Sequence, residues 1–296
     1  MTLPAAGPAA GPAARPPRAP AALPMTPGRW ITLLIGVPVA LALIGWTAFS
    51  FVAGIGQASF PVNATIALEK GQLVASTNGA DITLHQDQAR SSTARLTGTV
   101  QYSLVRPKFT VIGPAVNLDC HIPSGNCGLN ATLDVPADTP VDLATGGGNV
   151  QASGIQRDVS MDTAGGDVTI SDIGSNTDLS TGGGNVDAGH LGGIVKFTTA
   201  GGDVTVNDLA SQNVTLETGG GNITLVFTKA PISLDITSAG GDVNVMLPHG
   251  STYYRVKVTA DGGDYAPSPT VPTSSRSGNA ITVDSGGGNV TIAEAS

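Results

Sequence analysis

The feature that most constrains this chain is a short pattern that recurs from Leu143 to the C-terminus. Each copy has an alternating hydrophobic segment, a run of glycines, an Asn or Asp, and a second alternating segment. The Asn or Asp after the glycines marks the copies and falls at Asn149, Asp167, Asn185, Asp203, Asn222, Asp242, Asp264 and Asn289. The first markers lie 18 residues apart, and later ones lie farther apart. This period, with turn-forming residues in every copy, predicts a repeat architecture.

The residues of one copy predict a strand, a sharp turn and a second strand. Glycine accepts positive φ without a steric penalty, and Asn and Asp tolerate the left-handed region, so we interpret the markers as structural turns. After the turn, Val168 and Ile170 lie on one side of the chain and Thr169 on the other. This period of two is typical of half-buried β-strands. The 40 glycines and only 4% aromatic residues also favour a turn-rich, all-β fold.

Copies with Gly-Gly-Gly-Asn alternate with copies containing Ala-Gly-Gly-Asp. The third residue after the marker alternates with them, and its first four occurrences are Ala152, Ile170, Ala188 and Val206. Small side chains beside large ones would let adjacent layers interdigitate, which indicates that successive copies are neighbours in space. We therefore predict a stacked β-solenoid-like repeat domain over residues 141–296. The alternative is a folded hairpin meander, because Gly-Gly-Asn also closes hairpins.

The second residue after each marker faces away from the predicted core and is small and polar in most copies. Four threonines at this position are our candidate binding face: Thr169, Thr205, Thr224 and Thr291. A flat row of hydroxyl groups suits a surface protein, a glycan or a wall polymer as partner. The alternative is that this row is simply the solvated side of a sheet.

Residues 55–140 predict an N-terminal β segment that includes one further copy of the pattern at 76–84. The two cysteines of the chain, Cys120 and Cys127, lie close together in this segment. We predict that they form a local disulfide, since the segment is expected outside the cell. A metal site with His121 is the alternative, although it lacks the full ligand set of a structural zinc site.

The stretch 247–280 interrupts the pattern and contains Pro267, Pro269 and Pro272 together with three tyrosines. The tyrosines are Tyr253, Tyr254 and Tyr265. We expect them to be core aromatics of an irregular copy, and a surface for specific contact is the alternative.

Two segments precede the β region. Residues 1–29 are rich in Pro, Ala and Gly and predict a disordered cytoplasmic tail. Residues 31–53 form an uncharged apolar run long enough to cross a bilayer, so we predict one transmembrane helix over 30–54. The three cationic residues ahead of this run are arginines, and the next charge is Glu69. The N-terminus is therefore predicted in the cytoplasm and the C-terminal domain outside a plasma membrane; a cleaved signal peptide is the alternative.

The distribution of titratable residues argues against catalysis and nucleic-acid binding. The chain has a net charge of −8, and no basic cluster lies in the predicted folded part. The four histidines, which are His85, His121, His190 and His249, follow no catalytic or metal-ligand spacing. We therefore expect no enzyme activity, no cofactor and no metal. The alternative is a calcium-stabilised repeat that uses Asp167, Asp203, Asp242 and Asp264, whereas we expect these residues to cap turns.

The units Thr-Ala-Gly-Gly-Asp-Val-Thr-Ile and Thr-Gly-Gly-Gly-Asn-Val, together with the lead-in Leu-Asp-Val-Pro-Ala-Asp-Thr-Pro from Leu133, resemble the bacterial family of putative adhesins. The resemblance covers residues 70–296. It implies a β-repeat domain outside the cytoplasm with a surface or adhesive role, and it supplies no catalytic residues. We therefore expect a membrane-anchored, adhesin-like interaction or structural module. An envelope sensor that signals through the helix and the tail is the alternative.

Overall fold

The structure, a computed structural model, describes residues 57–88, 90–103, 105–119, 127–265 and 268–295. Contacts divide the chain into two compact units, Met1–Val52 and Ala53–Ser296, and all described residues belong to the second. The predicted tail and the predicted span 31–53 lie outside the described residues. Within the described ranges, no helix has the length and apolar character needed to cross a membrane.

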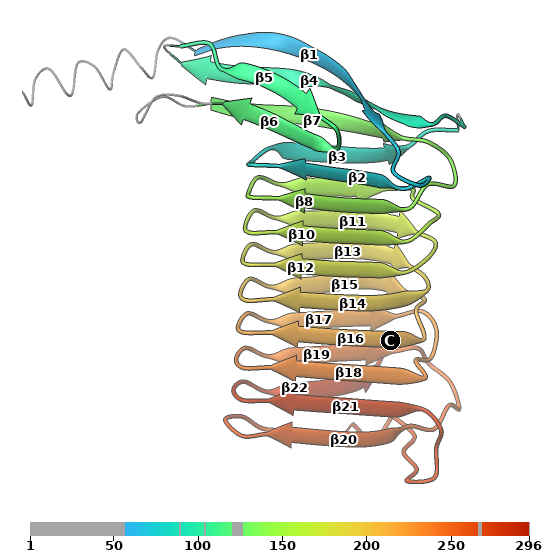
Figure 1. The fold of residues 1–296 in the computed structure, drawn as a ribbon. Helices are drawn as coiled ribbons and strands as arrows, with labels where there is room; N and C mark the ends of the chain where they lie inside the picture. Colours follow the sequence, from blue (N-terminus) through green and yellow to red (C-terminus); the bar gives the residue numbers. More distant parts are fainter. Residues whose placement is uncertain (1–56, 89, 104, 120–126, 266–267, 296) are drawn as a thin grey trace, which may run out of the picture. The chain divides into compact units, whose positions relative to one another are not determined.

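The described residues form two sheets, and Figure 1 shows the strands of both sheets stacked along one axis, with the sheets facing each other. Sheet I contains, in spatial order, β1 (Gln57–Ala67), β4 (Thr93–Ser103), β7 (Cys127–Val135), β3 (Asp81–Gln86), β9 (Val150–Ser153), β11 (Val168–Ile173), β13 (Val186–Leu191), β15 (Val204–Leu209), β17 (Ile223–Phe227), β19 (Val243–Leu247) and β22 (Val290–Glu294). Sheet II contains β20 (Arg255–Ala260), β21 (Ala280–Ser285), β18 (Ser233–Ser238), β16 (Asn213–Thr218), β14 (Ile194–Thr199), β12 (Thr177–Thr181), β10 (Val159–Thr163), β8 (Val141–Thr145), β2 (Leu73–Thr77), β6 (Ala115–Asp119) and β5 (Lys108–Ile112).

One copy of the pattern is one coil of the stack. In the coil of β10 and β11, the first strand lies in sheet II, the Ala-Gly-Gly-Asp turn crosses to sheet I, and a second turn returns to sheet II at β12. Equivalent strands of neighbouring coils pair in parallel and in register, for example Val168 with Val150 and Val186. The glycine turns therefore join strands of different sheets. This excludes a hairpin meander for these coils, because a hairpin would pair the two strands that its turn connects.

The core lies between the two sheets and follows the predicted alternation. Val168 and Ile170 are buried, whereas Thr169 between them is exposed. Ala152 and Ala188 lie on either side of Ile170 in the parallel register, and all three are buried. In these coils the small and large side chains therefore alternate, as the sequence predicts. Each fully buried Leu or Ile side chain contributes about 1.5–3 kcal/mol relative to exposure, so every coil adds to the stability of its neighbours.

The turn between the sheets needs both a hydroxyl and a glycine. The buried Thr145 donates from Oγ1 to the carbonyl of Gly147 at 2.7 Å, and Thr163 makes the equivalent bond to Gly165. The last glycine of the turn, Gly166, has φ +88°, and a Cβ there would lie 2.1 Å from the carbonyl oxygen of Gly148 in the next coil. The left-handed backbone and the close stacking of carbonyls both explain why this residue is glycine.

The N-terminal end of the stack departs from the repeat. After β3 the chain forms β4 to β7 on the outer side of β2 and β3, where β6 pairs with β2, and β8 then pairs with β2 on its other side. β7 is parallel to β3, but β4 and β1 pair antiparallel at the edge of sheet I. Cys127 opens β7, and no described cysteine is a free thiol. Its predicted partner Cys120 lies outside the described residues, so the disulfide stays a prediction.

The C-terminal end places its coils out of sequence order. β20 precedes β21 in the chain, yet β21 lies between β18 and β20 in sheet II. In sheet I, Tyr265 forms a bridge with Val290 on the outer side of β22. The stretch 248–265 therefore forms the outermost coil, and the last two strands insert inside it. This coil is less buried than the others, because Val256 and Val258 on its inward side stay half-exposed.

Candidate functional site

The outward face of sheet I carries one continuous row of side chains, which we call the polar file. The parallel register aligns its members across the coils in the order Thr83, Gln151, Thr169, Asp187, Thr205, Thr224, Asn244 and Thr291. All eight are exposed or half-exposed. Neighbouring strands lie ~4.8 Å apart, so the seven steps of the file span about 34 Å.

The structure brings all four predicted binding residues into this file. Thr205 and Thr224 are direct neighbours in the register. Thr169 lies two coils from Thr205, with Asp187 between them, and Thr291 lies two coils from Thr224. Thr83 extends the file toward the N-terminal end through the early copy at 76–84.

The outward face of sheet II has a different charge. Its exposed or half-exposed acids are Asp142, Asp162, Asp178, Glu217, Asp235 and Asp284. Lys196 on the same face lies 3.8 Å from Asp178 through Nζ and Oδ2. The polar file on sheet I holds one charge, Asp187. The two faces of the same coils therefore present different chemistry to a partner.

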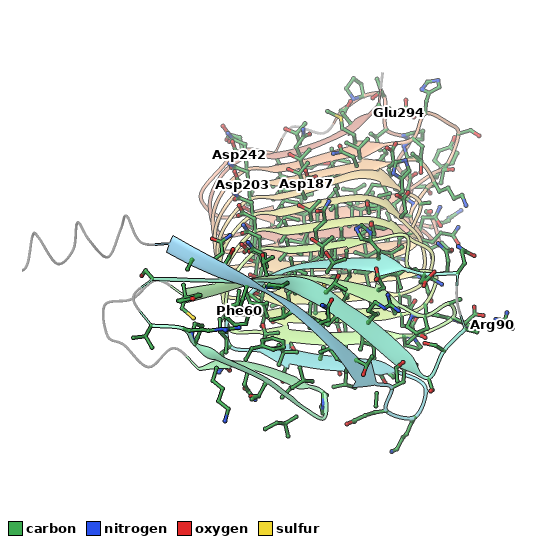
Figure 2. The ribbon with its side chains drawn as sticks, turned by 90° about the horizontal axis from the view of Figure 1, so that it is seen from above. Phe60, Arg90, Asp187, Asp203, Asp242 and Glu294 are labelled. Atoms are coloured by element: carbon green, nitrogen blue, oxygen red, sulfur yellow. The ribbon has the colours of Figure 1, made fainter. Side chains whose placement is uncertain are left out.

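The predicted turn residues form a second row, the marker ladder, along the edge where the glycine turns run. Each marker except the last one in the stack, Asp264, accepts the backbone N–H of the marker in the next coil through its side-chain Oδ1. The distances lie between 2.7 and 3.1 Å for Asp81, Asn149, Asp167, Asn185, Asp203, Asn222, Asp242, Asn289 and Asp264, taken in spatial order. Figure 2, seen from above the stack, shows Asp203 and Asp242 at this edge and Asp187 farther in.

Asp and Asn alternate without exception along the ladder in space. Along the sequence, Asp242 and Asp264 are consecutive markers, but Asn289 lies between them in the stack. An amide between two carboxylates keeps like charges about two strand spacings apart, or ~9.6 Å. The amide also has a donor, and Asn222 Nδ2 donates to Asp203 Oδ1 at 3.3 Å.

This alternation bears on the calcium alternative. Ligands of one Ca²⁺ lie 2.3–2.6 Å from the ion, whereas successive Asp markers are separated by ~9.6 Å of stack. Asp167, Asp203, Asp242 and Asp264 therefore cannot share one ion. Within the described residues, no group of three or more His, Cys, Asp and Glu side chains could hold a metal.

A groove of about 400 Å³ lies where the ladder meets the polar file in the first three coils. Its polar walls come from Asp81, Asn149 and Asp167 of the ladder and from Thr83, Gln151 and Thr169 of the file, while Ile82 and Val150 lie between these rows with their side chains buried in the core. The sequence places Gln151 in the same outward row as Thr169, although only threonines were chosen as candidate binding residues, and Thr83 was missed. Thr83 occupies the same position after Asp81 in the early copy, and this shared position is the signal that identifies it.

The described histidines lie in different environments. His85 Nδ1 pairs with Ser153 Oγ at 2.9 Å, and His249 Nδ1 lies 3.0 Å from Glu294 Oε2. His190 lies between Asp172 and Asp208 of the neighbouring coils, at 3.7 and 3.4 Å.

The tyrosines of the irregular stretch have different roles. Tyr254 is buried, and its hydroxyl has no hydrogen-bond partner among the described residues. Burial raises its pKa above 10, and the charge of Glu294 adds to the rise. Burial also raises the pKa of the half-buried Tyr265. Tyr253 is exposed, so the expectation of core aromatics holds for Tyr254 and Tyr265 but not for Tyr253.

Comparison with known proteins places the chain in a family. No curated protein matches it. A solved structure of a putative adhesin from Bacteroides fragilis has 13% identity, with 80% of this chain and 97% of that chain covered and a TM-score of 0.40. A putative cell adhesion protein from Clostridium sporogenes has 11% identity, 80% and 100% coverage and a TM-score of 0.21. The family model described as Toastrack DUF4097 matches residues 61–293, and the chain therefore belongs to the Toastrack DUF4097 family.

Proposed function

We propose that this protein is a non-catalytic, adhesin-like interaction module whose binding surface is the polar file of sheet I. The observation that carries the proposal is the in-register alignment of eight short polar side chains over about 34 Å. Because the stack holds the row in place, its polar groups are already ordered before a partner binds. Little conformational entropy is then lost on binding. The partner classes are a surface protein, a glycan or a wall polymer.

The environments of the described histidines support the absence of catalysis in this proposal. His85, His190 and His249 contact different partners on separate strands or loops. A general base needs a nucleophile or substrate within hydrogen-bond reach in a site that excludes water. The two rings that lie beside carboxylates, His190 and His249, are 65% and 86% exposed, so water reaches both of them.

We also propose that the module is tethered to the outer face of the plasma membrane. The support is the uncharged run 31–53, which follows three arginines and ends shortly before the first strand begins. A disulfide between Cys120 and Cys127 would close the segment ahead of β7 in that oxidising space.

A second candidate is an envelope sensor, favoured by the Pro-rich tail of residues 1–29 ahead of the predicted span. The two functions differ in what the tail does. An adhesin keeps its binding when a neutral linker replaces residues 1–29, whereas a sensor loses its output while the outer domain stays intact.

The test of the leading proposal compares two faces of the same protein. Full-length chain in detergent micelles is incubated with envelope extract, and retained proteins and polymers are quantified. Changing Thr169, Thr205 and Thr224 to Lys should abolish saturable binding. A matched variant with Ser160, Thr215 and Thr237 of sheet II changed to Lys adds the same charge to the opposite face and should bind like the parent. Equal loss in both variants, or no loss in either, contradicts the assignment of the face.

A further inference from the structure

The groove at the first three coils points to a class of ligand. It lies between the marker ladder and the polar file, and each of the three coils supplies one side chain from each row. Asp81, Asn149 and Asp167 contribute carboxylate and amide groups, while Thr83, Gln151 and Thr169 contribute hydroxyls and a further amide. These groups together both donate and accept hydrogen bonds.

The ladder holds its side chains in place before any ligand arrives. Asp81 Oδ1 accepts the N–H of Asn149 at 2.7 Å, and Asn149 Oδ1 accepts the N–H of Asp167 at 2.9 Å. One oxygen of each side chain is therefore occupied by a hydrogen bond to the next coil. The second carboxylate oxygen of Asp81 and the amide nitrogen of Asn149 remain available to a ligand, in positions fixed by the stack.

The charge of the groove excludes several ligands. Two carboxylates line it and no Lys or Arg does, so a phosphate- or carboxylate-bearing polymer would meet like charge without compensation. An extended peptide would have to pair with strand edges, but on this face the backbone groups of β3, β9 and β11 already pair with neighbouring strands. A neutral ligand rich in hydroxyl groups matches the donors and acceptors of the walls.

The shape of the surface indicates that the ligand is long and linear. The groove continues directly into the polar file, which presents one side chain per coil every ~4.8 Å. A linear polymer that lies along the stack can contact successive coils with successive units, so that weak hydrogen bonds at each step act together.

We propose that the protein binds an uncharged, linear polysaccharide along sheet I, with the groove formed by β3, β9 and β11 as its anchoring subsite. This inference rests on the proposed function and specifies its ligand. Affinity should rise with the length of the oligosaccharide until the chain spans the file. It should be insensitive to salt, because no ion pair contributes.

The experiment uses the full-length chain in detergent micelles and titration calorimetry. The probes are neutral β-1,4-linked glucose and N-acetylglucosamine oligomers of increasing length, with galacturonate oligomers of equal length as the anionic counterpart. We expect binding to at least one neutral series and at least tenfold weaker binding of the anionic oligomers. Tighter binding of the anionic oligomers would overturn the ligand class.

Alanine variants locate the subsite with little risk to folding, since they shorten exposed or half-exposed side chains. Gln151→Ala combined with Thr169→Ala should weaken neutral oligomers at least tenfold. The pair Thr224→Ala and Thr291→Ala at the far end of the file should weaken only the longest oligomers, by less than about threefold. Ser160→Ala on sheet II should change nothing. Equal affinities for the groove pair and the parent would overturn the subsite.

The outcomes separate this inference from the proposed function. If no neutral oligomer binds but a protein or charged polymer from envelope extract still requires the polar file, the ligand class is wrong and the interaction module stands. If neither oligomers nor extract components depend on the file, both proposals fail.

Discussion

The two outward faces of the coil stack are built from the same turns and the same core, yet they differ in chemistry. The polar file of sheet I carries a single charge, Asp187, whereas the outward positions of sheet II carry six carboxylates together with the cations Lys196, Arg255 and Lys257. The core therefore does not dictate the surface, because side chains alternate strictly between inside and outside along each strand. Either face can vary without disturbing the packing between the sheets.

Both faces nevertheless obey one electrostatic rule. In the register of the described strands, no acid lies directly opposite another acid, and Asp178 for example lies between Ser160 and Lys196. The marker ladder follows the same rule with Asn between Asp residues, and His190 lies between Asp172 and Asp208. In a parallel in-register stack, equivalent positions of neighbouring copies lie ~4.8 Å apart. Like charges at the same position must therefore be at least two copies apart to avoid direct repulsion. Four experiments test how far the faces are independent, from the largest expected effect to the smallest.

The glycine turn is the element that both faces share, so Gly184→Ala should damage both. Gly184 has φ +88°, and a Cβ would lie 2.1 Å from the carbonyl oxygen of Gly166. We expect a loss of about 3–5 kcal/mol in the free energy of unfolding, measured by urea denaturation. Gly183→Ala is the matched control, since a Cβ there has nothing within 4 Å. A similar loss in both variants would show that the close contact is not the cause.

The marker ladder lies at the edge between the two faces, and an added carboxylate in it should lower the stability of the protein. Asn185→Asp places three carboxylates in adjacent coils, because Asp167 and Asp203 lie in the coils on either side. We expect a loss of about 1–2 kcal/mol at neutral pH and low ionic strength.

The repulsion in Asn185→Asp raises the pKa of the clustered carboxyls above their unfolded values, so stability is regained as the pH falls and is lost as the pH rises. Asp203→Asn, which keeps the Oδ1 acceptor, should cost less than about 0.5 kcal/mol. The measurement is thermal unfolding of both variants between pH 3 and 8, with and without salt. A loss of stability in Asn185→Asp that does not change with pH would exclude repulsion as its cause.

The end of the stack, where both faces finish, contains an unsatisfied group. Tyr254→Phe removes a buried hydroxyl that has no partner among the described residues, and should raise the free energy of unfolding by about 1 kcal/mol. Because the pKa of Tyr254 is raised, the parent should lose stability as the pH rises above 10, where the unfolded tyrosine ionises first. The variant should lose less over this range in alkaline denaturation. A destabilised variant would indicate a partner, such as water, for the hydroxyl.

The smallest effect belongs to the charged face alone. Lys196→Gln removes a contact with Asp178 in which both side chains are more than half exposed. We expect a loss of about 0.3 kcal/mol that disappears in high salt, and no effect on binding at sheet I. Thr215→Gln on the same face is the control for the substitution itself. A loss above 1 kcal/mol would mean that this pair on the outward face of sheet II contributes far more to stability than its exposure suggests.

The sequence alone is enough to predict the all-β class, the copies, their turns and the inward and outward side of each strand. These properties are local: glycine at positive φ sets the turn, and the period of two sets the faces. It also aligned Thr169, Thr205, Thr224 and Thr291, because the same offset from the marker fixes their place in the coil. The groove could not be predicted in the same way, because its walls combine two rows of side chains from three coils. The marker of its first coil, Asp81, lies 68 residues before the marker of the second, Asn149.

The pairing of the strands, in contrast, depends on how the two sheets pack against each other. Gly-Gly-Asn closes a hairpin or crosses between sheets with the same residues, and the choice depends on burial between two sheets rather than on the turn itself. The order of the last coils was decided in the same way. The consecutive markers Asp242 and Asp264 broke the alternation along the chain, and inserting Asn289 between them restores it in space. Sequence order carries no information about such an insertion, whereas repulsion between stacked carboxylates and the hydrogen bonds of the ladder act on neighbours in the fold.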